Sequence, residues 1–285
     1  MRNTILDQIY YSTVRVECGD GSVGTAYIVN TLHLLGEYGK IFLVSNNHVV
    51  KGKMGCHITF HRADSLENKE KIGVYRHKFK NLRWDKEWKS HPNPSIDLAI
   101  LDLTPYLHEL ADLGIFLFYR SIPLADIPNY DEMSMIQAIE QVFFVGYPSG
   151  LIDKVNNLPI ARKGHLATPL HENFGGEPLF LIDASVFGGS SGSPVFIIND
   201  GNGYTKTNGD ITFGGTRFYL IGTIFEVHLQ LTDRQNIDLG RVWKSQTILE
   251  LIEFHFIPGI ISSHNTFTAT RFLTENPPLE SNISS

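Results

Sequence analysis

Nine short apolar segments, bounded by Gly, Asn, Asp, Ser or Pro, constrain the fold of this chain more than any other feature. They cover residues 12–18, 24–30, 40–46, 56–61, 97–103, 141–147, 178–184, 193–198 and 217–227. Val, Ile, Phe and Tyr are frequent in them, and these residue types favour strands. Their spacing is typical of antiparallel barrels or sandwiches rather than of strands that alternate with helices. The sequence therefore predicts an all-β fold.

Apolar residues at helical spacing occur clearly in one place, WKSQTILELIEF, which predicts a helix over 243–254. Residues 104–140 are mixed in pattern, with a short helix predicted at 105–113, and we interpret them as the connection between two halves. The segment after about residue 262 is polar and contains Pro, so we expect it to be mobile.

Composition and charge exclude several classes of protein. The 285 residues carry a net charge of -6, whereas nucleic-acid binders usually have a strong basic excess. No apolar run approaches the roughly 20 residues needed to cross a bilayer, and we see no signal peptide at the N-terminus. Two cysteines, Cys18 and Cys56, do not make a disulfide framework, so we expect both to be reduced structural thiols. These features predict a cytoplasmic protein that contacts neither nucleic acid nor membrane.

The segment SVFGGSSGSPVF, residues 185–196, concentrates serine and glycine between apolar residues. Taken alone, it fits a tight turn as well as an active site. A serine becomes a nucleophile only with a base to take its proton and a group to orient that base. Two such residues stand at strand ends, since His48 follows the apolar run of FLVSNNHVV and Asp97 opens the strand of NPSIDLAIL.

Other residues compete for each of these roles. The competitors are Ser185, Ser190, Ser193, His91 and Asp102. His91 lies in the loop KSHPNPS with no adjoining strand, so we expect it at the surface. Asp102 lies five residues beyond Asp97 on the same predicted strand. It would face the opposite side, about 17 Å away along the chain.

Together, the three segments resemble the His, Asp and Ser motifs of trypsin-like serine proteases, in that order along the chain. The resemblance covers roughly residues 12–230 and points to the bacterial glutamyl-endopeptidase and HtrA-like branch, which shares the G-x-S-G-S/G pattern. It implies two six-stranded antiparallel β-barrels with a C-terminal α-helix. The implied units are an N-terminal barrel over 1–135, a C-terminal barrel over 136–242, and a helix with a mobile tail over 243–285.

The same resemblance implies the role of each site residue. Ser191 corresponds to the nucleophile, His48 to the general base and Asp97 to the carboxylate that orients the imidazole. The backbone N–H groups of Gly189 and Ser191 correspond to the oxyanion hole. The implied substrate-binding residues are Ser185, Val186, Phe225, Glu226 and Val227.

These pocket residues predict which side chain precedes the cleaved bond. A neutral Ser185 at the base of the pocket cannot pair with Lys or Arg, and Val227 makes the pocket shallow and apolar. We therefore expect Ala, Val, Leu or a similar residue there. Glu226, if turned inward, would favour a basic residue instead, and His228 just beyond it would favour glutamate.

The predicted function is that of a serine endopeptidase that acts on polypeptides through an acyl-enzyme intermediate, without a metal or other cofactor. The sequence contains no H-E-x-x-H, C-x-x-C or P-loop motif. Two alternatives stay open: a binding or scaffold protein of the same fold with little turnover, and an esterase that uses the same triad. We expect any regulation to come from a protein partner or from oligomerisation.

Overall fold

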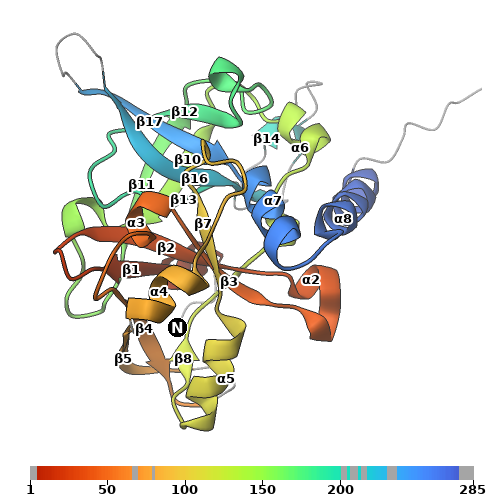
Figure 1. Ribbon diagram of the computed structural model, residues 1–285. Helices are drawn as coiled ribbons and strands as arrows, with labels where there is room; N and C mark the ends of the chain where they lie inside the picture. The colour runs from red at the N-terminus through yellow and green to blue at the C-terminus, as the bar shows by residue number, and fades with distance from the viewer. Residues whose placement is uncertain are drawn as a thin grey trace, which may run out of the picture.

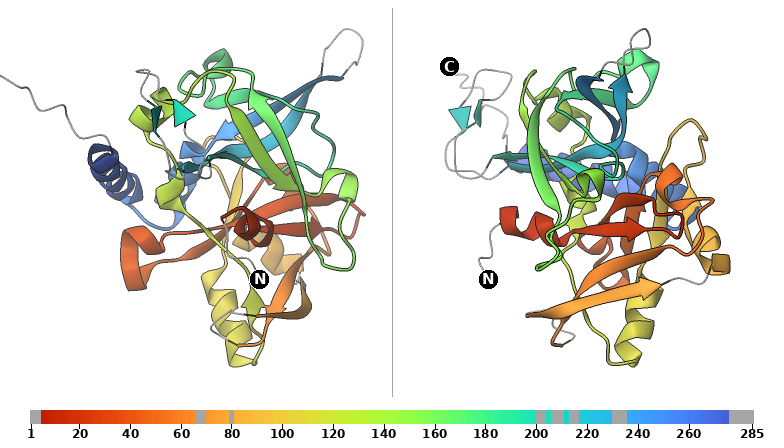
Figure 2. Two further views of the ribbon diagram at one scale, coloured as in Figure 1. Left: turned by 180° about the vertical axis from the view of Figure 1, so that it is seen from behind. Right: turned by 90° about the vertical axis from the view of Figure 1, so that its left-hand side faces the viewer.

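The computed structural model describes residues 5–65, 70–78, 81–199, 204–205, 211–212, 217–229 and 236–275. Strands of the first part of the chain form the lower half of the molecule in Figure 1, and those of the second part form the upper half. Two further views keep this arrangement, with the red and orange strands below the green and blue ones (Figure 2). The fold is therefore mostly β, as predicted.

The first sheet contains nine strands within the described residues and is not closed. Its strands pair in the order β5-β4-β1-β2-β3-β7-β6, while β8 pairs with β4 and β9 pairs with β2. They are β1 (Thr13–Glu17), β2 (Val23–Asn30), β3 (Ile41–Ser45), β4 (His57–Ala63), β5 (Lys71–Lys78), β6 (Lys89–Ser90), β7 (Ala99–Asp102), β8 (Leu117–Phe118) and β9 (Ile122–Pro123).

The prediction of a closed six-stranded N-terminal barrel is therefore wrong, and the reason lies between β5 and β6. A short helix, α4 (Asn81–Glu87), separates these two end strands in the chain, and β6 has only two residues. Trp84 and Trp88 lie in the interior of this half, where their rings contact each other and are almost fully buried. Strands β5 and β6 therefore stand at the two ends of the open sheet and do not pair with each other.

The second half is a closed barrel of six strands, which confirms the prediction for the C-terminal barrel. Its strands pair in the order β10-β11-β12-β17-β16-β13, all antiparallel. They are β10 (Gln141–Gly146), β11 (Ile160–Leu166), β12 (Leu179–Asp183), β13 (Pro194–Asn199), β16 (Arg217–Leu229) and β17 (Asn236–Lys244). A separate two-stranded pair consists of β14 (Tyr204–Thr205) and β15 (Ile211–Thr212).

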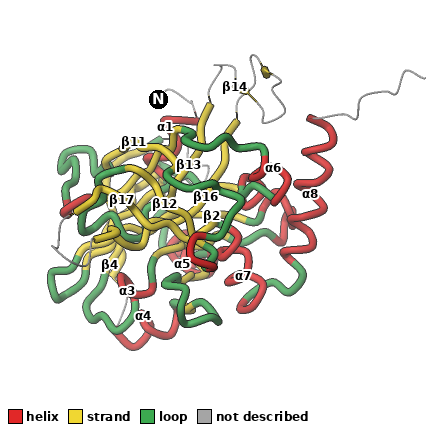
Figure 3. Tube along the Cα trace, turned by 90° about the horizontal axis from the view of Figure 1, so that it is seen from above, coloured by secondary structure: helices red, strands yellow, loops and turns green. Residues whose placement is uncertain are grey.

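Short helices connect the strands, and two longer ones follow the barrel. The α-helices are α1 (Ile5–Tyr11), α2 (Leu32–Leu35), α3 (Asn47–Val50), α4, α5 (Thr104–Asp112), α6 (Tyr130–Ser134), α7 (Gln246–His255) and α8 (Ile260–Glu275). The 3-10 turns are η1 (Gly36–Tyr38), η2 (Leu124–Asp126), η3 (Pro148–Gly150) and η4 (Phe174–Gly176). Seen from above, α7 and α8 lie together at one side of the strands (Figure 3). No helix within the described residues is long and apolar enough to span a membrane.

The end of the chain differs from the prediction in two ways. Trp243 still belongs to β17, so the predicted helix begins at Gln246 rather than at residue 243. The expectation of a mobile segment after residue 262 is wrong up to residue 275, because α8 occupies it. His264 and Thr268, four residues apart in this polar helix, are buried, and His264 Nε2 lies 3.0 Å from the carbonyl oxygen of Ile127. Because His264 and Thr268 are polar residues, the sequence did not indicate that this face of the helix is buried.

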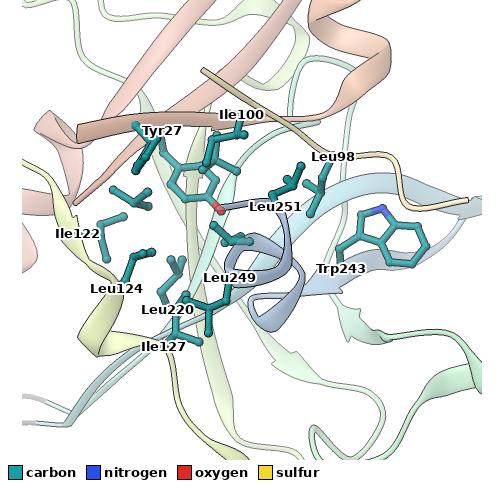
Figure 4. Packing of buried hydrophobic residues seen from close by; sticks show 14 of the residues in the cluster. Tyr27, Leu98, Ile100, Ile122, Leu124, Ile127, Leu220, Trp243, Leu249 and Leu251 are labelled. Atoms are coloured by element: carbon teal, nitrogen blue, oxygen red, sulfur yellow. The ribbon is translucent and has the colours of Figure 1, made fainter. Parts of the chain in front are cut away.

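Three apolar clusters make up the core. One fills the first sheet and a second fills the barrel. The third lies between the halves and includes Tyr27 of β2, Leu98 before β7, Trp243 of β17 and Leu251 of α7. Figure 4 shows these side chains converging from both halves and from α7. Helix α7 therefore seals the junction of the two halves.

Cys18 and Cys56 form a disulfide, so the prediction of two reduced thiols is wrong. Pairing of β1 with β4 places Glu17 opposite His57, and the adjoining cysteines then lie with their Cα atoms 3.8 Å apart. The expected cytoplasmic location loses the support of reduced cysteines, because disulfides persist mainly in oxidising compartments. The location of the protein stays a prediction.

Candidate active site

His48 and Asp97 lie at the same edge of the first sheet. Strands β3 and β7 are antiparallel, with Ser45 opposite Ala99, so the end of one strand adjoins the start of the other. His48 stands in α3 directly after β3, and Asp97 precedes β7. The side chain of Asn46 donates a hydrogen bond of 2.8 Å to the carbonyl oxygen of Asp97, which ties the two strand ends together.

Both oxygens of the Asp97 carboxylate contact His48. The backbone N–H of His48 donates to Oδ1 at 2.9 Å, and the ring atom Nδ1 lies 2.5 Å from Oδ2. The His48 side chain is 51% exposed and that of Asp97 is 28% exposed. The carboxylate therefore fixes the ring while Nε2 is left on the solvent side, available to a reacting group.

Ser191 lies in the turn between β12 and β13, at the junction of the two halves. Its carbonyl oxygen accepts a hydrogen bond of 3.0 Å from the N–H of Thr25 in β2. Its hydroxyl donates to the carbonyl oxygen of Phe225 in β16 at 3.3 Å. The serine thus contacts the first sheet on one side and a barrel strand on the other.

Gly192 brings this turn against the strand that leads to His48. Its φ is 87°, and a Cβ there would overlap the carbonyl oxygen of Thr25 and lie 2.8 Å from Ser45 Oγ. Only glycine tolerates both the left-handed backbone and this contact. The Ser191 turn therefore packs against β2 and the end of β3, and Ser45 at that end is three residues before His48.

The backbone N–H groups of Gly189 and Ser191 have no hydrogen-bond partner in the part of the chain that the structure describes. Gly189 has φ 85°, and a Cβ there would overlap the carbonyl oxygen of Tyr147. Paired N–H groups in such a turn can accept a developing negative charge on oxygen.

Two of the competing serines are buried, and the competing carboxylate, Asp102, forms an ion pair elsewhere. Ser190 is 2% exposed and Ser193 is fully buried, whereas Ser191 is partly exposed. Asp102 pairs with Lys40 Nζ at 2.6 Å on another part of β7. Neither of these serines nor Asp102 has the surroundings that would let it act with His48.

His91 is buried rather than at the surface, so that prediction is wrong. Its side chain is 2% exposed, and Nε2 lies 3.2 Å from Glu250 Oε2 on α7. The adjacent Ser90 carbonyl oxygen lies 2.9 Å from His255 Nε2 on the same helix. The loop before Asp97 is therefore anchored to α7, a contact that local sequence does not indicate.

The predicted pocket residues lie around the Ser191 turn, with different degrees of exposure. Ser185 is half-buried, and its carbonyl oxygen accepts a hydrogen bond from Arg162 of β11. Val186 is buried in the barrel, where Gly240 of β17 leaves room for it: a Cβ there would lie 2.7 Å from Val186 Cγ2. Arg162 was not foreseen, because its partner lies 23 residues further along the chain.

Phe225 contributes its backbone rather than its ring to the site. The ring is stacked on Trp243, with centroids 4.4 Å apart, and is buried at the junction of the halves. Glu226 and Val227 follow it in β16, opposite Arg241 and Gly240 of β17. The side chains of Glu226, Val227 and His228 lie outside the described residues.

Within the described ranges, no group of three or more His, Cys, Asp or Glu side chains is placed to hold a metal ion. The printed contacts join His48 to Asp97, and they join the Ser191 hydroxyl to the carbonyl oxygen of Phe225.

Comparisons with known proteins identify the family. Residues 24–202 match the family described as trypsin-like peptidase domain, a range that includes His48, Asp97 and Ser191. A search of curated proteins found no significant match.

A search of solved structures matched, among others, three proteases. Rv3671c from M. tuberculosis H37Rv, in an inactive form, has 16% identity and a TM-score of 0.44 over 89% of this chain and 90% of that one. The HtrA-type protease AlgW with a tripeptide has 15% identity and a TM-score of 0.48 over 89% of this chain and 62% of its own. The serine endoprotease from Yersinia pestis has 14% identity and a TM-score of 0.47 over 91% and 69% of the two chains.

Proposed function

Since this chain belongs to the family of trypsin-like peptidase domains, we propose that it is a serine endopeptidase that cleaves polypeptides with Ser191, His48 and Asp97 as its catalytic triad. The observation that carries the proposal is the double contact between His48 and the Asp97 carboxylate, beside the turn that holds Ser191. A carboxylate at Nδ1 selects the tautomer in which Nε2 is free to accept a proton.

The proposed reaction proceeds in two halves. Ser191 Oγ attacks the carbonyl carbon of the cleaved bond while its proton passes to His48 Nε2. The C–N bond then breaks, His48 returns the proton to the leaving amine, and the acyl group stays on Ser191. Water attacks this ester by the same route, with its proton passing to His48, and releases the acid and free Ser191. Asp97 stays ionised throughout and stabilises the imidazolium.

The N–H groups of Gly189 and Ser191 would bind the oxygen that becomes negative in each tetrahedral intermediate. Such donors act strongly because they are already oriented when the charge develops. The lack of any other partner for these N–H groups among the described residues supports this role.

Strand β16 would bind the substrate backbone. The pairing of β16 with β13 ends at Thr223. Beyond Thr223, the edge of β16 on the side of the Ser191 turn has no partner among the described strands. An extended peptide can add to such an edge. A backbone N–H of the substrate would bond to the carbonyl oxygen of Phe225. In the structure this oxygen accepts from the Ser191 hydroxyl, so substrate binding would free the hydroxyl to turn to His48.

The residue before the cleaved bond would lie over Ser185 and Val186. The hydroxyl of Ser185 is neutral, and Val186 fills the space above Gly240. The neutral Ser185 and the residue type of Val227 support a shallow apolar pocket and a preference for Ala, Val or Leu.

Casein hydrolysis tests the function directly, compared with hydrolysis of a p-nitrophenyl ester. Cleavage of casein that is lost in Ser191→Ala supports an endopeptidase. Ester hydrolysis without casein cleavage would indicate an esterase with the same triad. A protein inert towards both would correspond to the binding or scaffold alternative.

A further inference from the structure

Thr25, at the start of β2, is fully buried and links the Ser191 turn to its surroundings through every polar group it has. Its N–H donates to the Ser191 carbonyl oxygen at 3.0 Å, and its carbonyl oxygen accepts from Ser45 Oγ at 2.7 Å. Its hydroxyl lies 2.8 Å from the Gly189 carbonyl oxygen and 3.2 Å from the Tyr147 nitrogen. One side chain of the first sheet therefore contacts two segments of the barrel.

The direction of the hydroxyl hydrogen bonds is determined by their partners. A threonine hydroxyl has one proton to donate and can accept from others. The N–H of Tyr147 can only donate, so Thr25 Oγ1 accepts there, and its own proton is committed to Gly189. The result is a directed chain from the Tyr147 N–H through Thr25 to the Gly189 carbonyl.

Four consecutive backbone carbonyl groups of the turn each accept a hydrogen bond. Gly188 accepts from the N–H of Ser149 at 2.5 Å, Gly189 from the Thr25 hydroxyl, Ser190 from the N–H of Ser193 at 3.0 Å, and Ser191 from the N–H of Thr25. Thr25 supplies two of these four donors.

Anchored carbonyls determine where the N–H groups point. In a planar trans peptide the C=O and the following N–H point in opposite directions. The N–H of Gly189 therefore points away from Ser149, and the N–H of Ser191 points away from Ser193. Both are the N–H groups assigned above to the oxyanion hole.

The Gly188–Gly189 pair is the part of the turn that most needs such an anchor. Glycine rotates more freely about its backbone bonds than any other residue, so this peptide can turn over unless its neighbours hold it. The peptide that carries the Gly189 N–H is bonded at its Gly188 carbonyl by the N–H of Ser149. Thr25 acts on this peptide indirectly, because its hydroxyl donates to the carbonyl of the next peptide, at Gly189, and accepts from the N–H of Tyr147, two residues before Ser149. Ser149 itself has φ 51°, an unusual value for a residue other than glycine.

We propose that Thr25 is a positioning residue whose hydroxyl holds the oxyanion hole in its catalytic orientation. The proposal rests on the serine endopeptidase function proposed above. It explains how the hole is formed in this chain by a contact from the first sheet to the turn. It also makes the geometry of the hole depend on how the two halves are packed.

Three variants test the proposal. Thr25→Val removes the hydroxyl and keeps the branched shape, and Thr25→Ser restores the hydroxyl. Tyr27→Phe is the matched control, because it removes another buried hydroxyl of β2, one that bonds to Thr223 Oγ1 at 2.7 Å and does not contact the turn. The measurements are the rate of labelling by a fluorophosphonate probe, kcat and KM on a casein-derived peptide, and the melting temperature.

We expect Thr25→Val to lose about 10- to 100-fold in labelling rate and in kcat, with KM little changed, because oxyanion contacts act mainly in the transition state. Thr25→Ser should recover most of this loss. Tyr27→Phe should lower the melting temperature while both rates stay near those of the wild type. Should Thr25→Val fail to fold, Thr25→Ala takes its place with the same expectation.

Equal labelling rates for the wild type and Thr25→Val would contradict the role of Thr25 alone. So would a loss in Thr25→Ser as large as that in Thr25→Val, because a structural defect of size or shape would then explain the effect. A wild-type protein that is not labelled at all would contradict the proposed function, and the role of Thr25 would fall with it.

Discussion

Asp97 holds His48 at two points, through the backbone N–H at 2.9 Å and through Nδ1 at 2.5 Å. The first contact fixes the position of the α3 turn, and the second fixes the orientation of the ring. A carboxylate that only packed beside the histidine would not need both contacts. The pair is therefore arranged to keep Nε2 directed away from the sheet.

Replacing Asp97 with Asn should leave the fold intact and lower kcat by about 10⁴-fold, because an amide favours the wrong imidazole tautomer. Steady-state kinetics on casein peptides measures the loss, and circular dichroism checks the fold. Asp102→Asn is the control, since this carboxylate pairs with Lys40 and should leave kcat unchanged. The assignment of the carboxylate is wrong if Asp102→Asn causes the loss and Asp97→Asn does not.

The disulfide should contribute strongly to stability. It closes a loop with a sequence separation of 38 residues, for which chain entropy predicts about 4 kcal/mol. Urea unfolding with and without dithiothreitol should show this difference in the free energy of unfolding. The variant with both Cys18 and Cys56 changed to Ala should be insensitive to the reductant. An unchanged unfolding midpoint in reduced wild-type protein would contradict the bond.

Stability should fall below about pH 6.5 because of His61. Burial, with a smaller contribution from Lys71, lowers the pKa of His61 to about 4, so the folded protein keeps this ring neutral. In the unfolded chain the ring binds a proton near pH 6.5. Stability is therefore complete above that pH and is lost as the pH falls towards 4, by up to about 3 kcal/mol.

Urea unfolding at pH 7.5 and pH 4.5 measures this dependence. His61→Phe should flatten it, because the new ring does not titrate and can still face Tyr11. His165→Gln, at an exposed position, is the control and should keep the wild-type slope. Identical slopes for the wild type and His61→Phe would show that other groups cause the acid sensitivity.

Cleavage of a peptide library should show Ala, Val or Leu before the cleaved bond. The neutral Ser185 and the residue type of Val227 are the physical reasons for this preference. A dominant Lys or Arg would contradict the apolar pocket and point to Glu226. A dominant Glu would point to a cationic wall, with His228 and Arg162 as the residues to change.

The sequence predicted the site residues through local patterns. His48 follows an apolar strand, Asp97 opens one, and Ser191 lies in a glycine-rich turn, so each is recognisable from a few neighbours. The structure brings His48 and Asp97 into contact because β3 and β7 pair in antiparallel register. The pattern was available from the sequence, whereas the pairing of β3 with β7 came from the structure.

Contacts between distant segments could not be predicted in the same way. The Cys18–Cys56 bond depends on the pairing of β1 with β4, and the Thr25 hydroxyl meets a carbonyl 164 residues away. In the first sheet, β5 and β6 stand at opposite ends and do not pair, although the short helix α4 is the main element between them in the chain. These features follow from tertiary packing, and no local pattern of residue types indicates them.

Mass spectrometry of the fluorophosphonate adduct tests the central claim most directly. The wild-type protein should carry a single adduct on Ser191, and both Ser191→Ala and His48→Ala should lose nearly all labelling. The variant with both substitutions should be labelled at about the same rate as either single variant, because triad residues act as one unit and their losses do not add. An adduct on Ser190 or Ser193, or undiminished labelling of Ser191→Ala, would contradict the account.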